Sequence, residues 1–192
     1  NYKKFYSVIV LAVVNSDLAF TYVNIGASGR GNDSSVYSRS NLSDGLKNST
    51  YEDYYIMING VKVQSHLVAD SAFALDKTVI KPFSEHPDMS REERTFNYRL
   101  SICRCTVERA FGMLKNRFRL LHKRIEHNLN NSINFIKAAA ILHNLCVLSG
   151  DSCEVEWHLP QSVHKKPSCN IINKAGIDVR KALCNFFTKN PL

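Results

Sequence analysis

The chain has 192 residues, of which 44% are hydrophobic, and its formal net charge is +8. This length and composition predict a globular protein with a real core, most simply in one domain, and exclude disordered and fibrous classes. The longest apolar run, residues 8–14, is far shorter than the roughly 20 residues that span a bilayer, so no membrane span is expected. The six cysteines form no CxxC pair, which indicates reduced intracellular thiols.

The positive charge is concentrated in one part of the sequence. Residues 91–124 hold ten Arg and Lys against three Glu. A basic region of this kind is expected of a surface that binds phosphates. A solvated helix face has the same composition, so charge alone leaves both interpretations open.

The first predicted elements are two strands and a short helix. Residues 6–14 are apolar and β-branched, residues 20–25 alternate, and the turn residues 15–17 between them predict an antiparallel hairpin. The glycine-rich stretch 26–33 predicts a loop, after which Asp33 or Ser34 caps a helix that runs to Tyr37.

The next segment is expected to be mostly irregular. Residues 38–60 are rich in Ser, Asn and Asp and predict a surface loop or insertion, with Asn59-Gly60 as a turn. Residues 66–69 then predict a short strand that places Asp70 at its carboxyl end, where open α/β sheets bind their ligands. The alternative for Asp70 is a simple Asx turn.

A long amphipathic helix is predicted to follow. Ser90 and Glu93 have capping-box spacing, and a break is expected near Gly112. Apolar residues recur at intervals of three and four, namely Phe96, Leu100, Cys103, Val107, Phe111, Leu114, Phe118 and Leu121. Glu108 falls about 100° round the helix from Val107, at the border of core and solvent. Its alternative role is a surface glutamate paired with Arg104.

Two further helices are predicted towards the end of the chain. Residues 131–148 are largely apolar except for His143-Asn144, and we expect a buried, hydrogen-bonded imidazole there rather than a catalytic one. Residues 149–173 are irregular in pattern, and residues 176–187 form an amphipathic helix.

Three carboxylates, Asp33, Asp70 and Glu108, are spaced 37 and 38 residues apart on these elements. Each carboxylate lies at a strand end or on a helix face, from which all three side chains could be directed at the same position. Carboxylate oxygens are the ligands that Mg²⁺ prefers, and a pair of such ions stabilises the attacking and leaving oxygens when a phosphodiester is cut. The spacing therefore suggests a metal-dependent nuclease site.

Several blocks of the sequence resemble the Harbinger transposase-derived nucleases, in the order of that family. They are residues 1–7, Gly29-Arg30 with Asp33, 69–75, 97–101, 107–112, 114–115, 117–120 and 142–144, with a looser likeness at 179–183. Ala69 stands where the family commonly has glycine, a change that alanine tolerates unless φ is positive.

The resemblance implies an α/β fold of the ribonuclease H-like DDE type. Residues 1–148 would form the DDE endonuclease domain, and residues 149–192 an irregular linker with a C-terminal helix packed on it. The family's first catalytic aspartate and its central strand are expected upstream of residue 1, so the chain is interpreted as an N-terminally truncated fragment that is inactive by itself.

The resemblance also implies the site and the activity. Asp33, Asp70 and Glu108 would be catalytic ligands of Mg²⁺ or Mn²⁺, with Asp33 either a ligand or an organiser of the helix start. DNA phosphates would be held by Arg99, Arg104, Arg109, Lys115, Arg117 and Arg119. The expected function is DNA endonuclease activity, with strand transfer in active elements. The alternative is a domesticated, inactive protein that binds DNA or a nuclear partner.

A separate Myb-like DNA-binding protein is the expected partner, and the expected location is the nucleus and cytoplasm. Homo-oligomer formation is left open.

Overall fold

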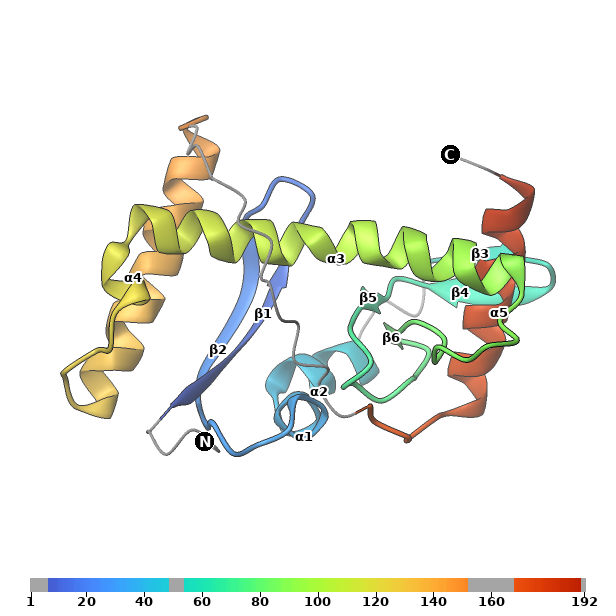
Figure 1. Cartoon of the computed structure of the whole chain (residues 1–192), viewed down its shortest axis with the longest axis horizontal. Coiled ribbons are helices and arrows are strands. Elements are labelled where there is room, and N and C mark those ends of the chain that lie inside the picture. The colour runs from blue at the N-terminus through green and yellow to red at the C-terminus, as the bar shows by residue number, and fades with distance from the viewer. Residues whose placement is uncertain (1–6, 49–53, 152–167, 191–192) are drawn as a thin grey trace. The chain divides into compact units, whose positions relative to one another are not determined.

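A computed structural model describes residues 7–48, 54–151 and 168–190 of the chain (Figure 1). Its described strands form three two-stranded sheets that alternate with helices, which confirms a mixed α/β class. The chain divides into two compact units, one from Asn1–Gly31 and Cys105–His164 and the other from Asn32–Arg104 and Lys165–Leu192. No helix in the described ranges combines the length and apolar character that crossing a membrane requires.

The first unit contains the predicted hairpin of β1 (Val8–Val14) and β2 (Phe20–Ser28). Asn15 Oδ1 accepts the N–H groups of Asp17 and Ala19 and so closes the turn. Gly26, with φ of 117°, is the extra residue of a bulge, a conformation that favours glycine. Strand β1 is half-buried along most of its length, and among the described strands it pairs with β2 alone.

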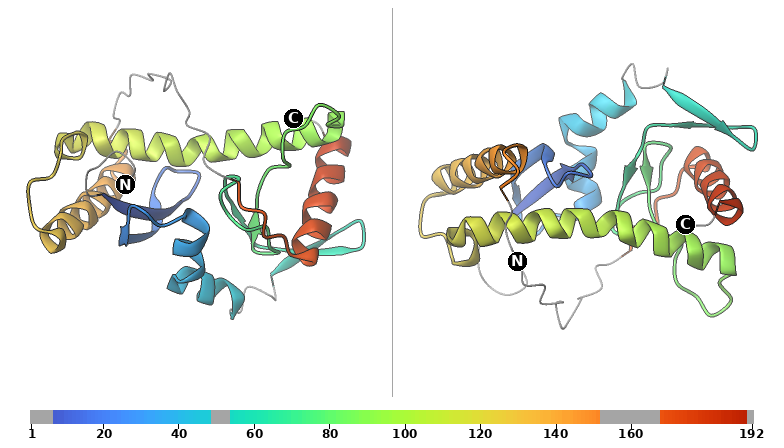
Figure 2. Two further views of the ribbon diagram at one scale, coloured as in Figure 1. Left: turned by 60° about the horizontal axis from the view of Figure 1, so that its bottom comes forward. Right: turned by 90° about the horizontal axis from the view of Figure 1, so that it is seen from above.

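Helix α4 (Leu129–Leu148) packs against β2 in the same unit (Figure 2). Asn128 caps it by accepting the Asn131 N–H. The core here consists of Phe20, Ala110, Leu114, Ala139 and Ala140. Helix α4 thus contributes small residues, Ala139 and Ala140, to the side of this core that faces Phe20 of β2.

The second unit overturns the prediction of an irregular segment over residues 38–60. After α1 (Asp33–Ser38) it forms α2 (Asn41–Lys47), and then β3 (Tyr55–Ile58) pairs with β4 (Val61–Gln64). Ser40 caps α2 by accepting the Ser43 N–H, so the polar residues there begin a helix. The predicted Asn59-Gly60 turn is confirmed, with φ of 51° and 79° as a tight hairpin requires.

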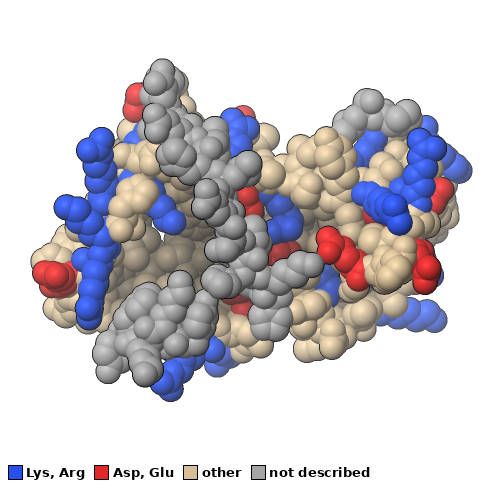
Figure 3. Space-filling model, in the orientation of Figure 1, with Lys and Arg blue, Asp and Glu red and all other residues tan. Residues whose placement is uncertain are grey.

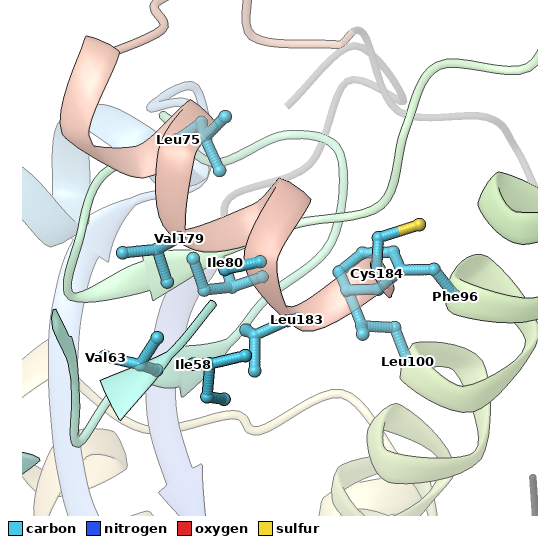
Figure 4. Packing of buried hydrophobic residues seen from close by; sticks show 10 residues of the cluster. Ile58, Val63, Leu75, Ile80, Phe96, Leu100, Val179, Leu183 and Cys184 are labelled. Atoms are coloured by element: carbon cyan, nitrogen blue, oxygen red, sulfur yellow. The ribbon is translucent and has the colours of Figure 1, made fainter. Parts of the chain in front are cut away.

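The core of the second unit forms where α5 (Lys174–Lys189) meets β3, β4 and β6. Figure 4 shows Val179 and Leu183 of α5 among residues of these strands and of α3. The two parallel strands β5 (Leu67–Val68) and β6 (Val79–Ile80) lie beside this core. Burying such a cluster supplies the main stabilisation of the unit.

Helix α3 (Arg91–Arg117) begins with the predicted capping box. Ser90 Oγ accepts the Glu93 N–H, and Glu93 Oε2 accepts the Ser90 N–H, each at 3.1 Å. The helix runs through Gly112 without the expected break, and a 3₁₀ turn, η2 (Arg119–His122), follows. Of the predicted stripe, Phe96, Leu100 and Leu114 are buried, whereas Cys103 is exposed.

Candidate functional site

Asp70 lies at the carboxyl end of a parallel strand, as predicted. The Ala69 N–H donates to Ile80 O at 2.9 Å, which continues the β5–β6 pairing to the residue before Asp70. Asp70 Oδ1 accepts the Ala72 N–H at 2.9 Å, so the Asx turn is also present. A carboxylate has about four lone-pair positions, so this turn is compatible with a second role. Ala69 does not have a positive φ, which explains why alanine is tolerated there.

Lys81 is a buried cation near Asp70 that sequence reasoning missed. Lys81 is the first residue after β6, and Asp70 is the second residue after β5. Lys81 is only 5% exposed. Its Nζ donates to Cys169 O at 2.5 Å, and the Cys169 N–H donates to Ser71 O at 2.9 Å. Burial lowers the pKa of Lys81, while the charge of Asp70 acts in the opposite direction. In the sequence Lys81 is simply a lysine after two apolar residues. Its burial depends on contact with Cys169, which is distant along the chain.

Asp33 is the first residue of α1 and is not its cap. Asn32 holds the N-cap position, and its Oδ1 accepts the Ser35 N–H at 2.7 Å. The prediction that Asp33 or Ser34 caps the helix is therefore wrong by one residue, because Asn caps as well as Asp does. Asp33 still benefits from a favourable interaction with the helix dipole in the first turn. Its partly buried side chain belongs to the same unit as Asp70.

Glu108 lies on α3 with an exposed side chain. Among the described residues no ion pair joins it to Arg104, so the predicted alternative of a helix-surface pair is not formed. A glutamate held only by its helix can adopt several rotamers.

The convergence of the three carboxylates stays a prediction. Asp33 and Asp70 belong to one unit and Glu108 to the other. Over the ranges that the structure describes, no three His, Cys, Asp or Glu side chains are grouped to hold a metal ion. The donor chemistry nevertheless suits Mg²⁺ or Mn²⁺, because all three side chains offer carboxylate oxygens.

Arg99 and Arg117, both predicted to contact phosphates, are held by other residues of the protein. Arg99 donates to Asn190 O, and its guanidinium lies 4.8 Å from the Phe187 ring centroid. The Arg117 side chain is only 9% exposed and contacts both the carbonyl and the carboxylate of Asp151. Figure 3 shows Lys and Arg side chains on the face of the molecule that it displays. The exposed ones among the six are Arg109, Lys115 and Arg119.

His143 is buried and hydrogen-bonded, as predicted. Arg117 can only donate, so Nδ1 of the imidazole accepts from it at 3.2 Å and the Nε2–H donates to Leu18 O at 2.9 Å. Burial lowers the pKa of His143, the Leu18 carbonyl raises it and the Arg117 charge lowers it. The imidazole is thus a neutral structural group that joins α4, α3 and the hairpin turn.

Asn144, beside it, binds the backbone of β2. Its Oδ1 accepts the Phe20 N–H and its Nδ2 donates to Phe20 O, both at 2.8 Å. Asn97 on α3 does the same at Phe83, with distances of 2.8 and 3.0 Å. Two of the sequence blocks that carry the family resemblance therefore contain structural asparagines, which leaves the carboxylates as the candidates for chemistry.

No curated protein and no solved structure matches this chain. A family model described as "DDE superfamily endonuclease" matches residues 1–144, the segment that contains Asp33, Asp70 and Glu108. Because the match covers well over half of the chain, the protein belongs to the DDE superfamily endonucleases.

Proposed function

We propose that the protein is a Harbinger-type DDE endonuclease with a ribonuclease H-like fold, which hydrolyses phosphodiester bonds in DNA. The observation that carries the proposal is the position of Asp70. It follows a parallel strand at its carboxyl end, within the segment that matches the endonuclease family. This end of the strands is where α/β sheets place their ligands.

Asp70 and Glu108 are the proposed metal ligands, with Asp33 as the third. A divalent cation such as Mg²⁺ or Mn²⁺, when bound, supplies an activated water and stabilises charge on the phosphate oxygens. The Asx turn fixes Asp70, because its Oδ1 is held by the Ala72 N–H. Glu108 would complete the ligand set from an exposed position on α3.

DNA would be held by exposed cations of the α3 region. Arg109, Lys115 and Arg119 are exposed, and Arg104 is partly exposed on the same helix. Contacts of this kind position the DNA backbone without reading its sequence, and they weaken steeply as salt is raised. Target choice would then come from a separate Myb-like protein, and the protein would act in the nucleus.

The test is nicking of supercoiled plasmid by the complete protein with Mg²⁺ or Mn²⁺. Asp70→Asn and Glu108→Gln are expected to abolish nicking, and Asp33→Asn to reduce it. Glu92→Gln is the matched control, because Glu92 is exposed on the same helix α3. Equal nicking by Glu108→Gln and Glu92→Gln removes Glu108 from the site, and nicking that survives Asp70→Asn refutes the proposal.

A second function, DNA binding without cleavage, is favoured by the exposed cations alone. It predicts that wild-type protein binds duplex DNA in a salt-dependent way and leaves plasmid intact with either metal. Titration of Mg²⁺ or Mn²⁺ then separates the two functions. A bound ion raises the melting temperature of the wild type but not of Asp70→Asn, whereas the non-catalytic protein shows no such difference.

A further inference from the structure

Helix α4 is apolar on both of its sides. One side packs on the hairpin, to which the buried His143 is bonded. The other side is exposed and carries four large aliphatic residues, namely Ile141 at 63%, Leu142 at 48%, Leu145 at 54% and Leu148 at 80% exposure. Lys137 is the only Lys, Arg, Asp or Glu among the 20 residues of the helix. A helix that is apolar all round is normally covered all round, so the exposed side is expected to bind a partner.

The exposed residues have the spacing of a seam between two helices. Four exposed positions recur at intervals of three, four and three residues, namely Ala138, Ile141, Leu145 and Leu148. This is the a/d spacing at which one α-helix packs along another. Leu142 lies one turn from both Ala138 and Leu145 and widens the row. We call these five residues the α4 seam.

The size of the α4 seam suits a small specific interface. At the exposed fractions above, its four large side chains present on the order of 400 Å² of apolar surface, which is in the range of the largest patches on monomeric proteins. Two such surfaces packed together, with their flanking residues, would bury about 1,000 Å² in total, the lower limit for a specific protein interface. The seam is therefore large enough for a reversible dimer and too small for a permanent one.

The order of small and large side chains along the seam favours a second copy in the antiparallel direction. In that direction a single register, centred at residue 143, places Ala138 opposite Leu148 of the second copy. The same register places Ile141 opposite Leu145, so each pair of side chains fills the space between the helices. Parallel packing would set Ala138 against Ala138 and leave a gap there. A two-fold axis also allows the same patch to serve both copies.

The charge on α4 is compatible with the same arrangement. The register places Lys137 beside Ser149 of the second copy, the C-cap residue of its α4. The carbonyl groups at a helix C-terminus carry partial negative charge, which attracts a lysine. Because α4 holds no other Asp, Glu, Arg or Lys, antiparallel pairing brings no like charges together along the two helices. A nucleic acid is disfavoured on this side, since aliphatic side chains offer it neither cations nor hydrogen bonds.

We propose that the α4 seam binds the α4 seam of a second copy of the protein, antiparallel and across a two-fold axis. The pair is reversible, with a dissociation constant in the micromolar range, because the interface is near the lower size limit. This inference goes beyond the proposed nuclease function and does not depend on it.

The test is sedimentation velocity of the complete protein from about 1 to about 100 µM, a range that brackets a micromolar dissociation constant. The wild type is expected to change from monomer to dimer across this range. Ala138→Arg keeps every large apolar side chain but sets a charge against Leu148 of the second copy, so the dissociation constant should rise about 100-fold or more. Ile56→Arg is the matched control, because Ile56 on β3 is 60% exposed and lies outside the seam. It should dimerise as the wild type does.

A melting experiment separates loss of the dimer from loss of the fold. Ala138 is exposed on α4, and arginine is a good helix former. Ala138→Arg should therefore melt as the wild type does at about 1 µM, where both proteins are monomeric.

Cysteine cross-linking tests the direction of the two helices. Under mild oxidation, the double variant Ala138→Cys/Leu148→Cys should form a covalent dimer, because the two positions face each other across the axis. Each single variant should not, since like positions would lie roughly 15 Å apart along antiparallel helices, beyond the reach of a disulfide. Peptide mapping by mass spectrometry identifies the linked cysteines and separates them from native ones such as Cys146.

Three results overturn the proposal. They are a wild type that stays monomeric up to about 100 µM, dimerisation of Ala138→Arg equal to that of Ile56→Arg, and cross-linking of the single variants as readily as of the double variant. Dimerisation that Ala138→Arg abolishes and Ile56→Arg preserves, with cross-links between positions 138 and 148, supports it. None of these measurements uses DNA or metal, so their outcome is independent of the nicking assay.

Discussion

The bond between Asn144 and the backbone of Phe20 gives the most direct test of how helix α4 is held. The N–H and C=O of Phe20 each bond the Asn144 amide at 2.8 Å. In Asn144→Ala both backbone groups lose their partner atoms. Phe20 is only 7% exposed, so water replaces them poorly. At about 1–3 kcal/mol for each unsatisfied group, partly relieved by local relaxation, the free energy of unfolding should fall by about 2–4 kcal/mol.

The assay combines urea unfolding with amide hydrogen exchange measured by NMR. The Phe20 N–H should exchange much faster in Asn144→Ala, which localises the loss to this bond. Asn134→Ala is the control, because Asn134 is exposed on the same helix. If Asn144→Ala stays within about 0.5 kcal/mol of the wild type and the Phe20 amide keeps its protection, the reasoning is refuted.

Three further predictions concern glycine, histidine and lysine positions. A Cβ on Gly176 would lie 2.9 Å from backbone atoms of Asp76, so Gly176→Ala should lower the free energy of unfolding by about 1–3 kcal/mol. Gly45 on α2 has open space around it, so Gly45→Ala should raise the free energy of unfolding by about 0.5–1 kcal/mol. Urea unfolding that orders the two variants the other way contradicts this. Burial lowers the pKa of His143 in the folded state, so the unfolded chain binds the proton more readily. Stability should be full above a pH of about 6.5 and fall as the pH drops below it, and His143→Gln, which cannot titrate, should flatten urea unfolding measured against pH. Lys81→Met should speed hydrogen exchange at the Cys169 N–H, because the Nζ bond to Cys169 O is lost; unchanged exchange would show that Lys81 does not hold this segment.

The elements that could be predicted from the sequence are those with local signals. The turn at Asn59-Gly60 needs two positive φ angles, and the start of α3 needs only Ser90 and Glu93. The strand that ends before Asp70 was also predicted, although it is shorter than expected. The turn and the helix start depend on contacts between residues a few positions apart, whereas the strand before Asp70 pairs with β6, which begins at Val79.

The features that could not be predicted depend on pairing between distant parts of the chain. Lys81 is buried because residues 168–173 lie beside residues 71–76, where Leu75 pairs with Ile172. Helix α2 was hidden because its cap, Ser40, lies in a polar stretch that has the composition of a loop.

The two asparagine bonds explain why family resemblance alone does not identify catalytic residues. Asn97 and Asn144 each lie in a block that resembles the family. The side-chain amide of each accepts the N–H and donates to the C=O of a single residue, as a neighbouring β-strand does. An amide in this geometry has both its oxygen and its nitrogen engaged by the backbone, so we assign it a structural role. The same reasoning applies to His143, whose two ring nitrogens are both engaged. Asp70 differs because a carboxylate has about four lone-pair positions, of which the Asx turn uses one. We expect Asn97→Ala and Asn144→Ala to lose stability but to cut DNA normally at low temperature. We expect Asp70→Asn to fold normally and not to cut. The opposite pattern overturns the division between structural and chemical residues.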